Sequence, residues 1–309
     1  MNIQLYPSKK IIIPNDRISK VVFDLTIDEY KAIVKRQSEL QVTEMRKSKS
    51  KRSDDIITPI MIKLEEAELR VSEPLDQFDC AVLSVCIAEW EEGNRHTTPA
   101  IIYRGLTGKV DKGTDAMPHV DQLTAINHSI EKLMRVQLDI RLVDVCRYLG
   151  YNNGKPKKVL ANILPCKRVD FTINGQEATT IELLAESPLF TVAKLKNNQI
   201  VSYDAKLLDM PGQQNTPKLI AVKHYVMKRV MEIIGHPKQM TASITFADVF
   251  KKCRIEDADN KTKQRVRNFI VEVFKHLLDC KVIKSYEVNK KGTGFHSVSF
   301  TFKRRVGRH

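Results

Sequence analysis

The residues best suited to recognition chemistry in this 309-residue chain lie along one segment, residues 260–278. Apolar residues recur there at helical spacing and share one face: Val266, Phe269, Ile270, Val273 and Leu277. The opposite face carries cations and amides: Lys261, Gln264, Arg265, Asn268 and Lys275. Arginine can pair with guanine through two hydrogen bonds, and asparagine or glutamine with adenine, whereas lysine neutralises phosphate. The pattern predicts an amphipathic helix suited to the major groove of double-stranded DNA.

After this helix the pattern changes to an alternation of apolar and polar residues over 282–288 and 296–302. Such alternation predicts two half-buried strands, and residues 289–294 between them form a basic hairpin tip with Lys290 and Lys291. A basic helix followed at once by such a hairpin is typical of a winged helix-turn-helix. In that motif the helix enters a major groove and the hairpin lies against the flanking backbone.

The two halves of this segment are expected to share the work of binding. We expect Gln264, Arg265 and Asn268 to face base edges. The residues expected to hold phosphates are Lys261, Arg267, Lys275, Lys290 and Lys291. The alternative to DNA binding is that this basic helix face is only a solvent-exposed surface with no ligand. The charge distribution favours DNA, because residues 216–309 hold 21 Lys and Arg against 8 Asp and Glu, a net +13 of the +14 for the whole chain.

Composition indicates a cytoplasmic protein with an anionic partner. The six cysteines include no CxxC pair and no metal-ligand spacing, so we expect them to be reduced. Residues 1–14 lack the apolar region and cleavage site of a signal peptide. No apolar run approaches the roughly 18 residues of a membrane span, so no membrane association is expected.

The sequence displays no recognisable catalytic signature. The eight histidines form no His-x-His pair of the kind used by rolling-circle nickases. Residues 150–155 resemble a phosphate loop, but the glycines are one residue too close and Pro156 stands where Ser or Thr should bind magnesium. Tyr225 and Tyr286 fit apolar patterns and are expected in the core. We therefore expect a binding protein with no enzymatic activity, no cofactor and no metal.

The order of elements recurs along the chain. Helices begin near residues 75, 98 and 118 and a strand near 137, and the corresponding starts in the second half are 217, 245, 260 and 281. Near-constant offsets predict an α+β fold with two winged helix-turn-helix domains in tandem, the first with extra β-hairpins. The expected domains are a mixed N-terminal extension (1–71), a first winged helix (72–210) and a second DNA-binding winged helix (216–305), joined by a polar linker at 210–215.

The first copy differs from the second in charge. The exposed face of its third helix includes Asp121 and Glu131, which would repel phosphate, so we expect it to serve dimerisation or a weaker contact. Its hairpin tip is basic and adds three candidate DNA-binding residues, Lys155, Lys157 and Lys158.

Further strands are predicted around the first copy. Residues 11–13 and 21–25 are strand-like, and residues 167–184 form a hairpin around the Asn174-Gly175 turn. Residues 189–195 and 199–204 are predicted to form another pair of strands. These hairpins are expected to extend the sheet of the first domain.

The sequence resembles the replication initiator proteins of plasmids and related mobile elements of Gram-positive bacteria, which are built from winged helices. The resemblance covers residues 72–303 and rests on the paired order and on the stretches 74–79, 173–176 and 188–190. It implies binding to repeated origin sites in double-stranded DNA, a monomer–dimer balance and recruitment of host replication proteins.

Three rival functions remain open on the sequence alone. A transcriptional repressor could use the same modules on a promoter palindrome. A nickase or primase would need a catalytic group that the sequence does not display. A scaffold could present its basic surface to an acidic protein.

Overall fold

The computed structural model describes residues 6–24, 28–33, 35, 60–63, 67–71, 74–111, 117–140, 159–173, 176–196, 198–236, 241–292 and 294–302. Its helices are α1 (Arg17–Asp24), α3 (Gln77–Glu91), α4 (Pro99–Thr107), α5 (Val120–Arg135), α7 (Pro188–Leu195), the 3-10 helix η2 (Ala205–Leu208), α8 (Pro217–Gly235), α9 (Phe246–Lys252) and α10 (Asn260–Asp279). Its strands are β1 (Lys10–Pro14), β2 (Ile60–Lys63), β3 (Ala67–Val71), β4 (His96–Thr97), β5 (Gln137–Ile140), β6 (Val159–Asn162), β7 (Cys166–Ile173), β8 (Gln176–Leu183), β9 (Ile200–Asp204), β10 (Ser243–Thr245), β11 (Ser285–Lys291) and β12 (Gly294–Thr301). The α+β class is confirmed.

The long helices begin at capping residues that the sequence displays. Asp76 caps α3 and forms a reciprocal capping box with Asp79. Thr98 and Thr216 each accept a backbone hydrogen bond and are followed by proline at the first helical position of α4 and α8. These local signals explain why the predicted starts of the helices agree with the structure.

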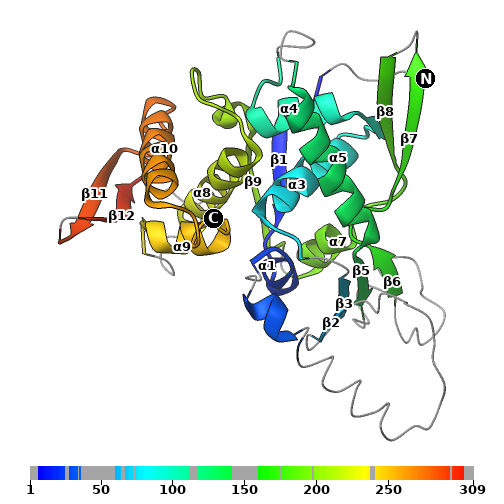
Figure 1. Ribbon diagram of the computed structural model, residues 1–309, viewed down its shortest axis with the longest axis horizontal. Coiled ribbons are helices and arrows are strands. Elements are labelled where there is room, and N and C mark those ends of the chain that lie inside the picture. The colour runs from blue at the N-terminus through cyan, green and yellow to red at the C-terminus, as the bar shows by residue number, and fades with distance from the viewer. Residues whose placement is uncertain are drawn as a thin grey trace, which may run out of the picture.

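Helices α3 and α8 form the centre of the molecule (Figure 1). Thirteen of the fifteen residues of α3 are buried. Helix α8 is buried from Leu219 to Val230, apart from Arg229, and again at Glu232 and Ile233. Helix α8 packs against α3 on one side and against α10 on the other. The buried residues of the first and second halves therefore form one continuous core rather than two.

The N-terminal segment is built into this core instead of preceding it. Strand β1 pairs antiparallel with β9, with Ile12 opposite Ser202. Residues 21–25 were predicted to be a strand, and this is wrong for the described part, because residues 17–24 form α1. Asp16 accepts hydrogen bonds from the backbone amides of Ile18 and Ser19, which starts a helix.

The first half does not repeat the sheet of the second half. Strand β4 pairs with β8 in the sheet β4-β8-β7, whereas β5 and β6 belong to a separate sheet in the order β2-β3-β5-β6. The hairpin predicted at 167–184 is present as β7 and β8, but it forms a sheet with β4 and does not extend the β5–β6 hairpin. Residues 189–195, predicted to be a strand, form α7, because Pro188 occupies its first turn.

The C-terminal unit has the order α8, β10, α9, α10, β11, β12. Its three strands form an antiparallel sheet in the order β10-β12-β11, so the first short strand pairs with the last. A bulge at Asn289 and Lys290 interrupts the β11–β12 register near the hairpin tip.

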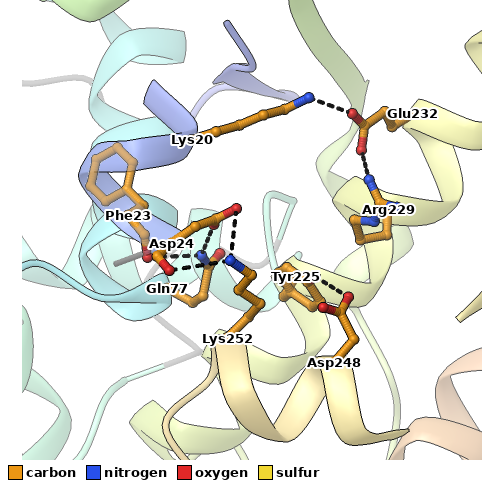
Figure 2. Close-up of polar contacts among 9 residues, drawn as sticks. All are labelled: Lys20, Phe23, Asp24, Gln77, Tyr225, Arg229, Glu232, Asp248 and Lys252. Carbon is orange, nitrogen blue, oxygen red and sulfur yellow. Dashed lines mark hydrogen bonds and ion pairs between the residues drawn. The ribbon is translucent and has the colours of Figure 1, made fainter. Parts of the chain in front are cut away.

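Polar contacts fasten the C-terminal unit to the rest of the chain (Figure 2). Lys20 of α1 donates to Glu232 of α8 at 2.8 Å, and Lys252 at the end of α9 donates to the Asp24 carbonyl at 3.2 Å. Beyond α9, Arg254 Nη2 donates to the Leu75 carbonyl at 2.6 Å. Burial alone would raise the pKa of Glu232, but hydrogen bonds from Lys20 and Asn15 and the charge of Arg229 outweigh it and lower the pKa to about 2.

Candidate nucleic-acid interface

Helix α10 is fixed by its start and by its apolar face. Asp259 caps the helix by accepting from the Thr262 amide at 2.8 Å, and the bonds from Thr262 lower the pKa of this carboxylate. The predicted apolar face is buried, together with Phe274. The centre of the Phe274 ring lies 5.6 Å from the centre of the Phe300 ring on β12. This aromatic contact packs the helix against the hairpin.

The opposite face of α10 is open to solvent, as the pattern predicted. Lys261, Gln264, Arg265, Asn268 and Lys275 are all exposed. Figure 1 shows α10 between the β11–β12 hairpin on one side and α8 on the other. A helix packed on one face and open on the other has the geometry needed to lie in a groove.

The polar side chains of this face are already connected to one another. Gln264 Nε2 donates to Asn268 Oδ1 at 2.9 Å, so the two amides lie side by side one turn apart. Arg267 Nη1 reaches Gln264 Oε1 at 3.4 Å. The Arg267 guanidinium is half-buried and lies 5.2 Å from the centre of the Phe250 ring on α9. Arg267 therefore lies at the α9–α10 contact, and its role in phosphate binding stays a prediction.

The hairpin tip presents two further cations. Lys290 and Lys291 are exposed, and the ammonium of Lys290 lies 5.7 Å from the centre of the Phe295 ring. Gly292 turns the chain there with φ of +64°, in the left-handed region that glycine adopts without strain. The tip thus carries two lysines at the end of a hairpin that packs against α10.

The linker before α8 forms the second wall of a hollow over α10. The hollow has a volume of about 650 Å³. It is lined from the other side by residues 212–214 and Leu219, and from α10 by Lys261, Gln264, Arg265, Asn268, Phe269 and Glu272. Arg265 Nη2 donates to the side-chain carbonyl of Gln214 across it. Sequence reasoning treated residues 210–215 only as a linker and missed this contact.

The linker is anchored from two helices. Lys223 of α8 is buried and its Nζ donates to the Leu208 carbonyl at 2.6 Å and to Asn215 Oδ1 at 3.3 Å. Gln122 of α5 donates to the Asn215 carbonyl at 2.7 Å. The residue after Gln214 is therefore held by both halves of the molecule.

The remaining predicted site residues are not placed by the structure. Lys155, Lys157 and Lys158 lie outside the described residues. Among the described residues, no helix is long and apolar enough to span a membrane.

Together these observations describe a mixed α+β protein with a cationic helix-and-hairpin surface in its C-terminal unit. No family model and no curated protein matches the chain. It overlaps two crystal structures of domains 2 and 3 of RctB: one is 11% identical with a TM-score of 0.34 and covers 78% of this chain and 89% of that chain. The other is 9% identical with a TM-score of 0.38 and covers 78% and 90%. A structural overlap with TM-scores of 0.34 and 0.38 does not establish a shared function.

Proposed function

We propose that the protein is a sequence-specific double-stranded DNA-binding protein and not an enzyme. The observation that carries this proposal is the exposed face of α10, where cations and amides alternate over about four helical turns beside a hairpin tip with two exposed lysines. Cations at both places can contact phosphates, and the amides and Arg265 can reach base edges between them.

The order of elements supports a winged helix for the C-terminal unit. A helix, a short strand, two helices and a hairpin, with the short strand paired to the last strand, are the parts of that motif. In this proposal α10 is the recognition helix and the β11–β12 hairpin is the wing. The first half has a different sheet arrangement, so its proposed role is dimerisation and support rather than a second equivalent reading head.

The proposal is tested by separating base reading from phosphate binding. Duplexes are selected from a random pool with the wild-type protein, and binding is measured for every single-base variant of the selected site. Arg265→Ala should lose about 1 to 3 kcal/mol of discrimination at one base position. Lys290→Ala/Lys291→Ala should weaken all duplexes alike and flatten the dependence of log K on log salt by roughly 0.9 for each lost phosphate contact.

Lys167→Ala is the matched control, because Lys167 is an exposed lysine on β7, on the opposite side of the molecule from α10 (Figure 1). Lys167→Ala should change neither the discrimination between bases nor the salt dependence of binding. Equal losses for Arg265→Ala on selected and random duplexes would remove the base-reading role, and failure to select any duplex at low salt would favour a scaffold that binds an acidic protein.

The biological setting we propose is the initiation of replication of a plasmid or mobile element. The resemblance of residues 72–303 to such initiators supports repeated origin sites, homodimers through the first half and host replication proteins as partners. A circular DNA that carries the gene and its flanking sequence should replicate with the wild-type protein and fail with Arg265→Ala. Repression of its own promoter without replication would instead support the repressor alternative.

A further inference from the structure

We infer that Gln214 in the linker is a positioning residue that sets the direction of the Arg265 side chain and so determines which base α10 reads. The inference rests on the proposed DNA-binding function and adds a specificity-determining residue from outside the recognition helix. Its basis is the hydrogen bond from Arg265 Nη2 to the Gln214 side-chain carbonyl across the hollow.

The geometry leaves one edge of the guanidinium available. A guanidinium has five N–H donors in a rigid plane, and pairing with guanine uses two on one edge. The hydrogen bond to Gln214 occupies a single donor of Nη2. Arg265 is exposed on α10 and lines the hollow, and this bond leaves its other four N–H donors unused.

Gln214 can act as a support because its neighbours are fixed. On its N-terminal side Gly212 makes a turn with φ of +76°, and the Gln213 amide donates to the Met210 carbonyl at 3.3 Å. On its C-terminal side Asn215 is bound by Lys223 and Gln122. A contact made from such a segment restrains Arg265, whereas a contact from a free loop would move with it.

Restraint of Arg265 before binding has a measurable consequence. A long side chain that is already oriented loses less conformational freedom when it meets a base, and the loss avoided corresponds to about two- to tenfold in affinity. Because the restraint acts only through Arg265, it should appear at the one base position that Arg265 reads. A structural role of the linker would instead weaken all duplexes.

The test uses the full-length protein and the single-base variants of the selected duplex. Gln214→Ala should reduce discrimination about two- to tenfold at the position read by Arg265 and leave the other positions unchanged. In an Arg265→Ala background, Gln214→Ala should have no further effect, since the group that it positions is gone. Gln213→Ala is the matched control. Gln213 lines the same hollow, but the hydrogen bonds of the described residues join Arg265 to Gln214 and not to Gln213.

The outcomes separate the inference from the proposed function. If Arg265→Ala shows a loss at one position and Gln214→Ala does not, the positioning role is overturned and the DNA-binding function stands. The positioning role is also overturned if Gln214→Ala tightens binding, weakens all duplexes alike or adds to Arg265→Ala. If Arg265→Ala itself shows no position-specific loss, the proposed base reading fails and the inference fails with it. Thermal unfolding of each variant checks that the fold is retained.

Discussion

At the scale of single residues, the buried Lys223, which anchors the linker, makes the stability of the protein depend on pH. Complete burial lowers the pKa of Lys223 to about 7 from an ordinary value of 10.5, with the Asp209 carboxylate opposing the shift. Between these two values the unfolded chain binds a proton that the folded protein releases. Stability therefore rises with pH across this window, by up to about 1.4 kcal/mol per pH unit from this group.

Lys223→Met should remove that rise. Urea unfolding of wild type and variant at pH 6.5, 7.5 and 8.5 gives the difference in unfolding free energy at each pH, from which the other titrating groups cancel. The difference should grow with pH in favour of the wild type. A difference that stays constant from pH 6.5 to 8.5 would show that Lys223 keeps an ordinary pKa in the folded protein.

Residue patterns predicted the candidate site only as far as one helix can specify it. The exposed face of α10 follows from spacing of side chains, and five of its predicted residues are exposed as expected. The turn of Arg267 toward Phe250 depends on how α9 packs, which spacing does not contain. The bond between Arg265 and Gln214 joins residues 51 positions apart, so no local pattern could have shown it.

At the scale of elements, the end of α4 is held unusually close to η2. Gly108 has φ of +76°, and a Cβ at this position would lie 2.3 Å from the Asp209 nitrogen and 2.7 Å from the Ala205 carbonyl oxygen. Both atoms belong to the backbone, so relief requires a shift of the 3-10 helix. That helix also contacts α10, since His276 Nε2 lies 3.1 Å from the Leu207 carbonyl oxygen.

Gly108→Ala should therefore destabilise the protein more than the backbone conformation alone explains. Gly93 after α3 is the matched control, with φ of +86° and open space around the added methyl group. Gly93→Ala should cost about 1 kcal/mol for the left-handed conformation. Gly108→Ala should cost at least about twice that, measured as unfolding free energies in urea. Equal costs would mean that the close approach to η2 is not rigid.

Elements were predictable where the signal is local and wrong where the partner is distant. Capping residues such as Thr98 and Thr216 marked the helices correctly. Residues 189–195 have strand-like composition, but the Ser187-Pro188 start and burial against β1 and β9 make them helical. The pairing of β4 with β8 rather than with β6 likewise depends on tertiary contacts, so the repeated order of elements did not imply a repeated sheet.

At the scale of the whole molecule, the two halves share a core through α8 and are joined at the surface by basic side chains from the second half. Helix α8 contacts both α3 and α10. Arg254 donates to the Leu75 carbonyl, and Lys252 to the Asp24 carbonyl shown in Figure 2. These two cations are thus used to hold the C-terminal unit in place, which fixes the direction in which α10 faces relative to the first half.

This shared core predicts that the halves unfold together. Trp90, the single tryptophan of the chain, lies in α3 and reports the first half, whereas far-UV circular dichroism reports the helices of both. The two signals should give one urea midpoint in the wild type. Arg254→Ala removes the charged hydrogen bond from the second half to the Leu75 carbonyl. It should lower both midpoints together, by an amount that corresponds to a loss of about 1 to 3 kcal/mol in unfolding free energy. Lys284 is exposed and serves as the control. The unfolding free energy of Lys284→Ala should stay within about 0.5 kcal/mol of the wild-type value. A Trp90 midpoint that stays fixed while the dichroism midpoint falls would show two independent units, and the orientation of α10 would then not be set by the first half.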